Sequence, residues 1–326
     1  MNIGRRSFLG LAAATGAARC IGTPAPAAGG GKDENLTVFV TDVHVSGLPD
    51  AIPKPYERLV RFVDEVLAMN PRPARVVSLG DLAYLHGLPE DYAKSKPILK
   101  KLEDAGIELA FAMGNHDRRS AFKEAWPEYV AKSPVPGRIV NIVSLGTADL
   151  VVLDGLQGSD ERARTDMGPG QAKLYPDVFA WCKKELPKRE RPFFVCSHWP
   201  VQEFTFPVKG KEKTSDLCKW LVNNAPQCKG YLYGHLHRWR PEWSHVGWKS
   251  SRTLRTLCLP SNGLWGDIGY ATFRTSADRA VCSLELRDFY FPREPETSAR
   301  PAAWKMKVEE TRGQRVTFLY DRGEPA

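Results

Sequence analysis

The sequence has little that would suggest a membrane, redox or repeat protein. It contains no uninterrupted apolar run of the roughly 18 to 20 residues that a bilayer-spanning helix needs. None of its cysteines lies in a C-x-x-C pair, so the spacing of zinc ribbons and redox motifs is absent. No internal repeat occurs, which excludes a repeat architecture. With 326 residues, 42% of them apolar, the chain can form one large domain, with or without a small appendage.

The chain also lacks a strong charge of either sign. It has 46 Lys and Arg residues against 38 Asp and Glu residues, a net charge of +8 at pH 7. Three of the arginines lie in the first 27 residues, which hold no acid, so the remaining chain carries +5. This mild excess is compatible with a phosphate-bearing substrate. It is too dispersed for a nucleic-acid groove, so we expect no stable nucleic-acid partner.

The N-terminus has the order of an export signal. Arg5 and Arg6 precede a weakly apolar stretch, which ends in small residues around a proline. The adjacent arginines followed by Ser-Phe-Leu resemble a twin-arginine signal. We therefore expect residues 1–28 to be cleaved and the protein to be periplasmic or secreted. Arg19 precedes Cys20, which does not suit lipoprotein cleavage, so we predict no membrane anchor.

The remaining chain alternates short β-branched runs with helical patterns. From 253 to 288 the pattern changes to strands without long helices. This order predicts an α/β fold with a mostly buried central sheet or pair of sheets. We expect a catalytic domain over residues 33–292. Residues 293–326 would form a linker and a C-terminal hairpin extension of the same domain.

Several of the predicted strands end in a potential metal ligand. Ligands of open α/β sheets gather beyond the carboxyl ends of the strands. Side chains far apart in sequence could therefore form one site at such an edge. The five residues at these ends are Asp42, Asp81, Asn115, His198 and His235.

These endings belong to five short motifs. They are "DVH" (Asp42, His44), "GD" (Asp81), "GNHD" (Asn115 to Asp117), "SH" (His198) and "GHLH" (His235, His237). The ordered set resembles the calcineurin-like metallophosphoesterase family and covers most of the chain. The resemblance implies two mixed β-sheets sandwiched between helices, with metals at one edge.

The resemblance also implies a ligand set for two divalent ions. Asp42, His44 and His237 would hold one ion. Asn115, His198 and His235 would hold the other, and Asp81 would bridge the two. Oxygen and imidazole ligands without thiolate suit manganese, iron or zinc. The implied reaction is the hydrolysis of a phosphodiester or phosphomonoester by in-line attack of a metal-bound hydroxide.

His116 and Asp117 are the candidate catalytic residues. Neighbouring side chains usually diverge, so His116 could face the substrate while Asn115 faces a metal. The resemblance makes His116 the proton donor to the leaving group or a stabiliser of developing charge. Asp117 could orient that imidazole. The alternative for both residues is a turn held by Asp side-chain hydrogen bonds.

Two alternatives to a D-x-H phosphoesterase remain. Tyr84 follows Asp81 by three residues, where the purple acid phosphatase branch binds ferric iron. His44 can occupy the place that this tyrosine would take, and we therefore favour the D-x-H type. A second acid is absent at Tyr84, which argues against a protein phosphatase. The other alternative is a non-catalytic, metal-dependent binding protein on the same fold.

The substrate is predicted only as a small phosphate ester. Aromatic side chains after His198 and after the last motif could stack on a base or pack in the core, which leaves a nucleotide-like substrate open. Basic side chains near the motifs could clamp phosphate or be solvated, and Asp154 could orient a ligand histidine or end a strand. Oligomeric state and metal identity stay open. The basic and aromatic candidates are Arg118, Arg119, Arg238, Arg240, Trp199, Phe204, Phe206, Trp265 and Tyr270.

Overall fold

The computed structural model describes residues 31–48, 54–157, 174–208, 211–245, 253–290 and 309–321. The predicted export signal and the predicted linker lie outside these residues. The described part belongs to one compact unit, Gly31–Ala326. No helix within it is both long and apolar enough to cross a bilayer.

The first of two six-stranded sheets begins with three parallel strands from the N-terminal half. Strands from the C-terminal part extend it on one side with antiparallel pairing, in the order β14-β13-β12-β1-β2-β3. The last strand, β14, pairs with β13, so the C-terminal segment is part of this sheet. The strands are β1 (Lys32–Val40), β2 (Arg72–Ser78), β3 (Glu108–Phe111), β12 (Gly266–Thr275), β13 (Arg279–Tyr290) and β14 (Arg315–Leu319).

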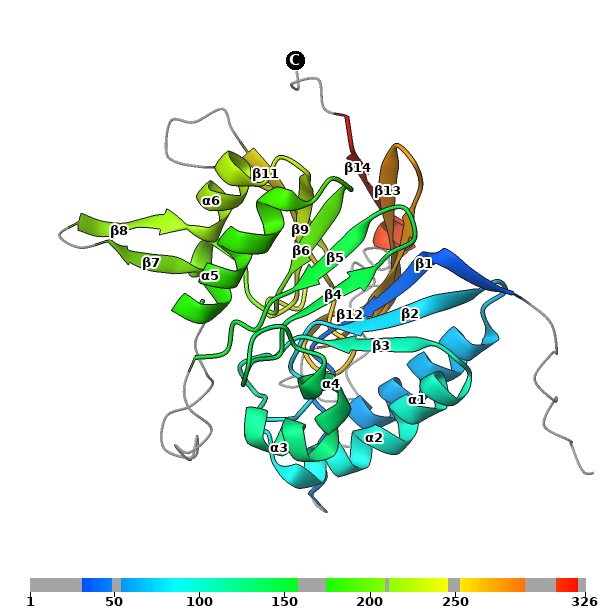
Figure 1. The fold of residues 1–326 in the computed structure, drawn as a ribbon. Helices are drawn as coiled ribbons and strands as arrows, with labels where there is room; N and C mark the ends of the chain where they lie inside the picture. The colour runs from blue at the N-terminus through cyan, green and yellow to red at the C-terminus, as the bar shows by residue number, and fades with distance from the viewer. Residues whose placement is uncertain are drawn as a thin grey trace, which may run out of the picture. The chain divides into compact units, whose positions relative to one another are not determined.

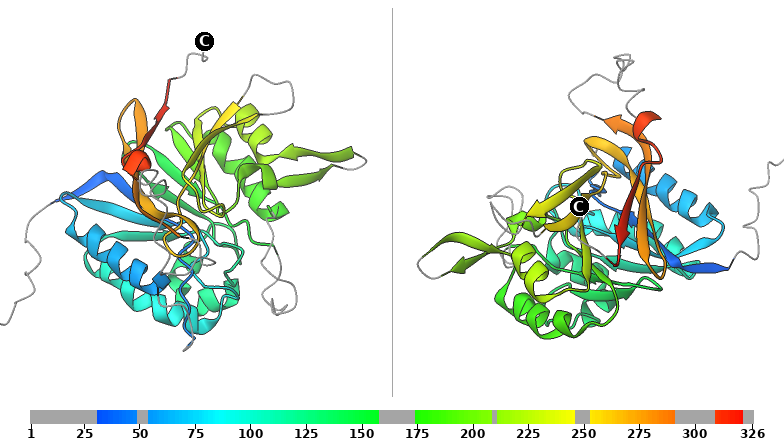
Figure 2. Two further views of the ribbon diagram at one scale, coloured as in Figure 1. Left: turned by 180° about the vertical axis from the view of Figure 1, so that it is seen from behind. Right: turned by 90° about the horizontal axis from the view of Figure 1, so that it is seen from above.

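The second sheet is also mixed. Its four central strands run parallel and its two edge strands antiparallel, in the order β10-β11-β9-β6-β5-β4. These strands are β4 (Asn141–Ser144), β5 (Asp149–Val152), β6 (Phe193–Cys196), β9 (Cys228–Tyr233), β10 (Arg240–His245) and β11 (Thr253–Cys258). A separate hairpin of β7 (Thr205–Val208) and β8 (Lys211–Asp216) extends away from both sheets (Figures 1 and 2).

Helices cover the outer face of each sheet (Figure 1). The apolar stripe of α1 is buried through Leu59, Phe62, Val63 and Val66, as its helical spacing requires. Pro176 begins α5, where its fixed φ and missing N–H are tolerated. The helices are α1 (Lys54–Ala68), α2 (Pro89–Asp104), α3 (Arg119–Ala125) and α4 (Pro127–Ala131) beside the first sheet, and α5 (Pro176–Glu185) and α6 (Leu217–Asn224) beside the second.

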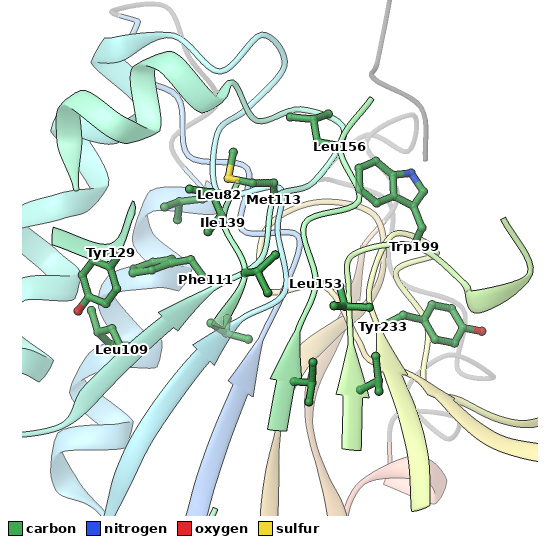
Figure 3. Packing of buried hydrophobic residues seen from close by; sticks show 14 of the residues in the cluster. Leu82, Leu109, Phe111, Met113, Tyr129, Ile139, Leu153, Leu156, Trp199 and Tyr233 are labelled. Atoms are coloured by element: carbon green, nitrogen blue, oxygen red, sulfur yellow. The ribbon is translucent and has the colours of Figure 1, made fainter. Parts of the chain in front are cut away.

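Alternation along the strands divides the core into layers. In β1, Phe39 faces the second sheet, and its neighbours Val38 and Val40 pack with residues of the covering helices. Phe273 lies between Phe39 and Phe194, with ring centroids 5.5 Å and 5.0 Å away, and so joins the two sheets. A second hydrophobic cluster, on the helix-covered faces of the sheets, runs from Leu109 and Tyr129 through Met113 to Trp199 and Tyr233 (Figure 3). The expected pair of mixed sheets between helices is confirmed.

Several cysteines lie in the core as free thiols. Cys182, Cys196 and Cys258 are buried and free. Burial raises the pKa of the Cys182 thiol to about 12. The six cysteines of the described chain form no disulfide with one another.

Candidate metal centre

The candidate ligands follow the carboxyl ends of parallel strands from both sheets. Five of them have a left-handed backbone, which non-glycine residues rarely adopt. Such a conformation costs on the order of 1 kcal/mol or more per residue and persists only where the surroundings impose it. These residues are Asp42 (φ 53°), His44 (53°), Asp81 (52°), His235 (66°) and His237 (53°).

The glycines before the ligands serve two different purposes. Gly80 has φ +95° and turns the chain sharply after β2. Gly114 and Gly234 are needed for close approach instead. A Cβ on Gly114 would lie 2.2 Å from Asp81 Oδ1, and one on Gly234 would lie 2.0 Å from Thr41 Oγ1. Any larger residue would push the ligand loops apart.

One group of ligands consists of Asp42, His44 and His237. His237 Nε2 lies 2.9 Å from Asp42 Oδ1 and 3.4 Å from His44 Nε2. All three side chains are buried, and their ligand atoms lie within 4.8 Å of one another. The loop after β1 and the loop after β9 therefore meet at one point.

A second group consists of Asn115, His198 and His235. Asn115 Oδ1 lies 2.9 Å from His198 Nε2 and 2.8 Å from His235 Nδ1. The two histidine nitrogens are 3.2 Å apart. This group joins the end of β3 in the first sheet to the ends of β6 and β9 in the second.

Asp81 lies between the two groups. Its Oδ2 atom is 3.2 Å from His198 Nε2 and 3.9 Å from His44 Nε2. Its Oδ1 atom accepts a hydrogen bond from the N–H of His116 at 2.7 Å. One carboxylate oxygen thus faces both groups, and all seven sequence-predicted ligands come together.

Backbone carbonyls fix the orientation of three imidazoles. A carbonyl oxygen only accepts hydrogen bonds, so the ring nitrogen beside it carries the proton and the other nitrogen faces the cluster. Metal-binding histidines are usually oriented in this way. The Nδ1 contacts are His44 to Tyr84 (3.1 Å), His198 to Leu79 (2.9 Å) and His237 to Leu264 (2.5 Å).

The electrostatics of the cluster favour a cation. Burial opposes ionisation of Asp42 and Asp81, yet the neighbouring histidines hold the pKa of both carboxyls well below the usual range. Burial also lowers the pKa of His198, but Asp81 and Asp42 outweigh it and raise that pKa to about 9. The field that attracts a proton to His198 also attracts a divalent ion, whose binding displaces the proton. The nitrogen and oxygen donors present therefore fit divalent metals.

His116 borders the cluster. Its Nε2 atom lies 4.0 Å from Asp81 Oδ2, and its Nδ1 atom lies 3.0 Å from the carbonyl oxygen of Leu85. It also lines the cavity beside the cluster. His116 forms a further group with His44 and Asp81 whose ligand atoms are close enough to hold an ion.

Asp117 connects the loops behind the cluster. Its Oδ2 atom accepts the N–H groups of Asp81 and Gly114, each at 2.8 Å. Its Oδ1 atom accepts from the N–H of Ala83 at 3.2 Å and from the Tyr92 hydroxyl at 3.1 Å. Burial and the nearby Asp81 charge raise the pKa of Asp117 to about 6. These hydrogen bonds match the alternative in which the Asp117 carboxylate holds a turn, because it accepts from the backbone N–H groups of three loop residues.

Arg119 has a role that differs from both sequence interpretations, whereas Asp154 follows β5 and accepts a turn hydrogen bond, as its strand-end interpretation expected. Arg119 is buried and forms a two-pronged pair with Asp154, at 2.7 Å and 2.8 Å. Asp154 also accepts the N–H groups of Ile139 and Leu156. Arg119 is therefore neither a solvated charge nor a phosphate clamp, and Asp154 joins α3 to the end of β5. Arg240 pairs with Glu242 at the surface.

A cavity of about 350 Å³ opens beside the cluster. Of the aromatic candidates, Trp199, Phe204 and Tyr270 are core residues, and the Phe206 side chain lies outside the described residues. Of the four candidates whose side chains are described, Trp265 alone lines this cavity. The lining residues are Asp81, Asn115, His116, His235, Leu236, His237, Arg238, Trp265 and Gly266.

The loop after β11 supports two of the candidate ligands, a role that the sequence did not indicate. Ser261 Oγ donates to the Asp42 carbonyl at 2.9 Å, and the N–H of Gly263 donates to the same oxygen. Leu264 orients His237, and the N–H of Asp267 donates to the His237 carbonyl at 2.9 Å. The dense Asn-Gly and Trp-Gly turn signals of this stretch indicated a loop, but they carry no information about what the loop contacts.

Comparisons with known proteins agree with this geometry. A family model described as calcineurin-like phosphoesterase matches residues 36–239. The chain is 24% identical over 215 residues to a "Probable cyclic nucleotide phosphodiesterase" of Rhodococcus erythropolis (strain PR4 / NBRC 100887). That match covers 63% of this chain and 66% of the relative, just under two thirds of its length.

Solved structures include distant matches. A structure of PhoD gives a TM-score of 0.48 at 11% identity, covering 88% of this chain and 70% of that one. The structure of Vps29 from Chaetomium thermophilum gives a TM-score of 0.38 at 12% identity, covering 88% of this chain and 99% of that one.

Proposed function

The chain belongs to the calcineurin-like phosphoesterase family, and from this premise we propose that it is an exported, dinuclear-metal phosphodiesterase. The name of the Rhodococcus relative supports a diester rather than a monoester as substrate. The open cavity beside the cluster has room for a second ester arm.

One observation carries the proposal. The inward Nε2 atoms of His44, His198 and His237 converge with the carboxylates of Asp42 and Asp81, while backbone carbonyls hold the opposite ring nitrogens. A structural cluster of this kind would bury five titratable groups and several strained residues without benefit to stability.

The proposed ligand sets are Asp42, His44 and His237 for one ion and Asn115, His198 and His235 for the other, with Asp81 shared. When bound, divalent ions supply the positive charge that activates water and stabilises the charge on the phosphate. The identity of the metal is left to measurement among manganese, iron and zinc.

The residues of the chain itself orient the substrate and handle the proton. His116 lines the cavity, and the Leu85 carbonyl fixes its Nδ1–H, so Nε2 is the nitrogen that can exchange a proton with a leaving alcohol. Asp117 acts as a positioning residue, because it holds the backbone of Asp81 and of the Gly114 turn.

The purple acid phosphatase alternative has less support. Tyr84 contributes its carbonyl to the site, and this carbonyl orients His44. His44 lies in the first group of candidate ligands, where it would take the metal position that a tyrosinate takes in the purple acid phosphatase branch. A purple colour that is lost in Tyr84→Phe would favour the alternative over our proposal.

The direct test is turnover of bis-p-nitrophenyl phosphate by the manganese-loaded protein. Asp81→Asn should lower kcat by about 1,000-fold or more and reduce bound metal, since the substitution removes the charge between both groups. Metal is counted by elemental analysis after dialysis. If both proteins bind metal but neither hydrolyses any diester or monoester, the chain is a metal-dependent binding protein.

A further inference from the structure

Each pair of ligand histidines has a tryptophan packed against it. The Trp199 ring lies 5.0 Å from His198 and 6.3 Å from His235. The Trp265 ring stacks on His237 at 5.8 Å with an angle of 20° and meets the edge of His44 at 5.8 Å. The two indoles therefore have equivalent places beside the two ligand groups.

The two tryptophans differ in what their remaining surface contacts. Trp199 is only 1% exposed, so its ring is enclosed in the core. Trp265 is half-buried and lines the cavity beside the cluster. Trp199 has no ring surface left for a ligand, because the histidines and the core enclose it. Part of the Trp265 ring, in contrast, faces the cavity.

The backbone around Trp265 is held in an unusual conformation. Trp265 has φ 54° and Gly266 has φ 73°, two consecutive left-handed residues. A Cβ on Gly266 would lie 2.1 Å from the carbonyl oxygen of His237, so this loop packs closely against the loop that follows β9. A bulky side chain in this conformation is a genuine outlier, and such outliers cluster at ligand-binding positions.

The rest of the cavity is suited to one apolar arm and one anion. Leu236 is 38% exposed and lines the cavity together with Trp265. Arg238 is an exposed cation of the same lining, and it forms no ion pair with any described carboxylate. The cavity thus has an apolar wall, a cation and, at its base, the metal ligands.

We propose that Trp265 and Leu236 form a subsite for a flat aromatic ester arm, so that the substrate is an aryl or nucleoside phosphodiester. Arg238 faces the phosphate anion. An indole face favours a flat ring over an aliphatic chain, because stacked π-systems gain energy beyond the area they bury. This inference rests on the proposed phosphodiesterase function and adds the class of the ester arm.

The test uses three phosphonates that carry a single arm on a non-hydrolysable P–C bond. Phenylphosphonate, cyclohexylphosphonate and methylphosphonate are compared as inhibitors of bis-p-nitrophenyl phosphate hydrolysis by the manganese-loaded full chain. Phenyl and cyclohexyl groups match in size and differ in flatness. We expect phenylphosphonate to inhibit about tenfold more strongly than methylphosphonate and several-fold more strongly than cyclohexylphosphonate.

The variants separate stacking from support of the metal ligands. Trp265→Ala should abolish the advantage of the phenyl arm, and Trp265→Phe should retain most of it. Trp265→Leu keeps an apolar side chain and should lose only the preference of phenyl over cyclohexyl. The matched control is Trp199→Phe, which should leave the ratio of inhibition constants unchanged. Each ratio is measured within one variant, so partial loss of metal cancels.

Two results would overturn the subsite. One is a phenyl advantage that survives in both Trp265→Ala and Trp265→Leu. The other is equal or stronger inhibition by cyclohexylphosphonate, which would assign the wall to an aliphatic arm. Failure of the proposed function looks different, because then no diester is hydrolysed by the loaded wild-type protein.

Discussion

The residues of the candidate site adopt conformations and burial that are locally unfavourable but that bring their side chains together. Five candidate ligands have left-handed φ angles, and Asp42 and Asp81 are buried carboxylates. The surrounding hydrogen bonds and close glycine contacts keep these conformations in place. Substitutions at single positions should therefore divide into those that affect metal binding and those that affect folding.

Gly234→Ala should weaken the first metal group. The new methyl group would lie 2.0 Å from Thr41 Oγ1 and 2.6 Å from Asp42 Oδ2, so the Asp42 carboxylate must move. We expect manganese affinity to fall by about 10- to 100-fold, the usual cost of disturbing a residue that supports a ligand. Titration calorimetry measures the change. Gly31→Ala is the control, because a Cβ there meets nothing within 4 Å.

Asp117→Asn should destabilise the metal-free protein. The carboxylate accepts from three backbone N–H groups and the Tyr92 hydroxyl, and an amide offers only one acceptor oxygen. A loss of about 2 kcal/mol in the free energy of unfolding is expected, measured by urea titration. The exposed Asp104→Asn should change it by less than about 0.5 kcal/mol. An unchanged stability in Asp117→Asn would contradict the positioning role.

At the scale of elements, helix α3 is attached to the second sheet by a buried ion pair. Arg119 and Asp154 connect the start of α3 to the end of β5, and Arg119 also donates to the carbonyl of Leu156. Since both charges are buried, removal of one leaves the other without compensation.

Arg119→Met or Asp154→Leu alone should cost about 3 to 5 kcal/mol of unfolding free energy. The double variant should be more stable than the sum of the two changes implies, because it leaves no buried charge. Urea titrations of the four proteins give the coupling energy. The exposed pair Lys100 and Asp104 serves as the reference, with a coupling expected below about 1 kcal/mol. If the losses of unfolding free energy in the two single variants simply add in the double variant, Arg119 and Asp154 do not stabilise the fold as a pair.

At the scale of the whole molecule, the candidate metal ligands come from both sheets. Asp42, Asp81 and Asn115 follow strands of the first sheet, whereas His198, His235 and His237 follow strands of the second. Bound ions would therefore cross-link loops that otherwise meet only through packing and hydrogen bonds.

Metal removal should lower the stability of the whole catalytic domain. At a free metal concentration about 1,000 times Kd, binding stabilises the folded state by about 4 kcal/mol per independent site. Thermal unfolding with and without a chelator measures this shift. The Tm of Asp81→Asn should depend much less on the chelator. A wild-type Tm that is the same with and without chelator would argue against bound metal.

The proposed export would be a property of the whole chain. If Arg5 and Arg6 form a twin-arginine signal, replacing both with lysine should retain the protein inside the cell. Fractionation followed by detection of the protein checks this outcome. The twin-arginine pathway carries folded proteins, so exported wild-type protein should already hold its metal. Normal export of the double-lysine variant would remove this proposal.

The amino-acid order was enough to identify the residues of the candidate site. The identity and order of the motifs predicted seven ligands, and the end of each strand predicted their shared edge, because parallel strands bring their carboxyl ends together. The alternation of strands and helices predicted the α/β class for the same local reason. These features depend on the chain direction and on residue type, which a sequence records directly.

The contacts between residues far apart in sequence became apparent only from the folded chain. The sequence could not indicate that Arg119 would be buried against Asp154, that Asp117 would hold the backbone of Asp81, or that Trp265 would stack on His237. These contacts depend on the packing of loops from separate strands, and turn residues predict a bend without predicting what lies beyond it. Local sequence motifs therefore predicted the candidate ligands, whereas the packing of the two sheets determines which residues hold them in place.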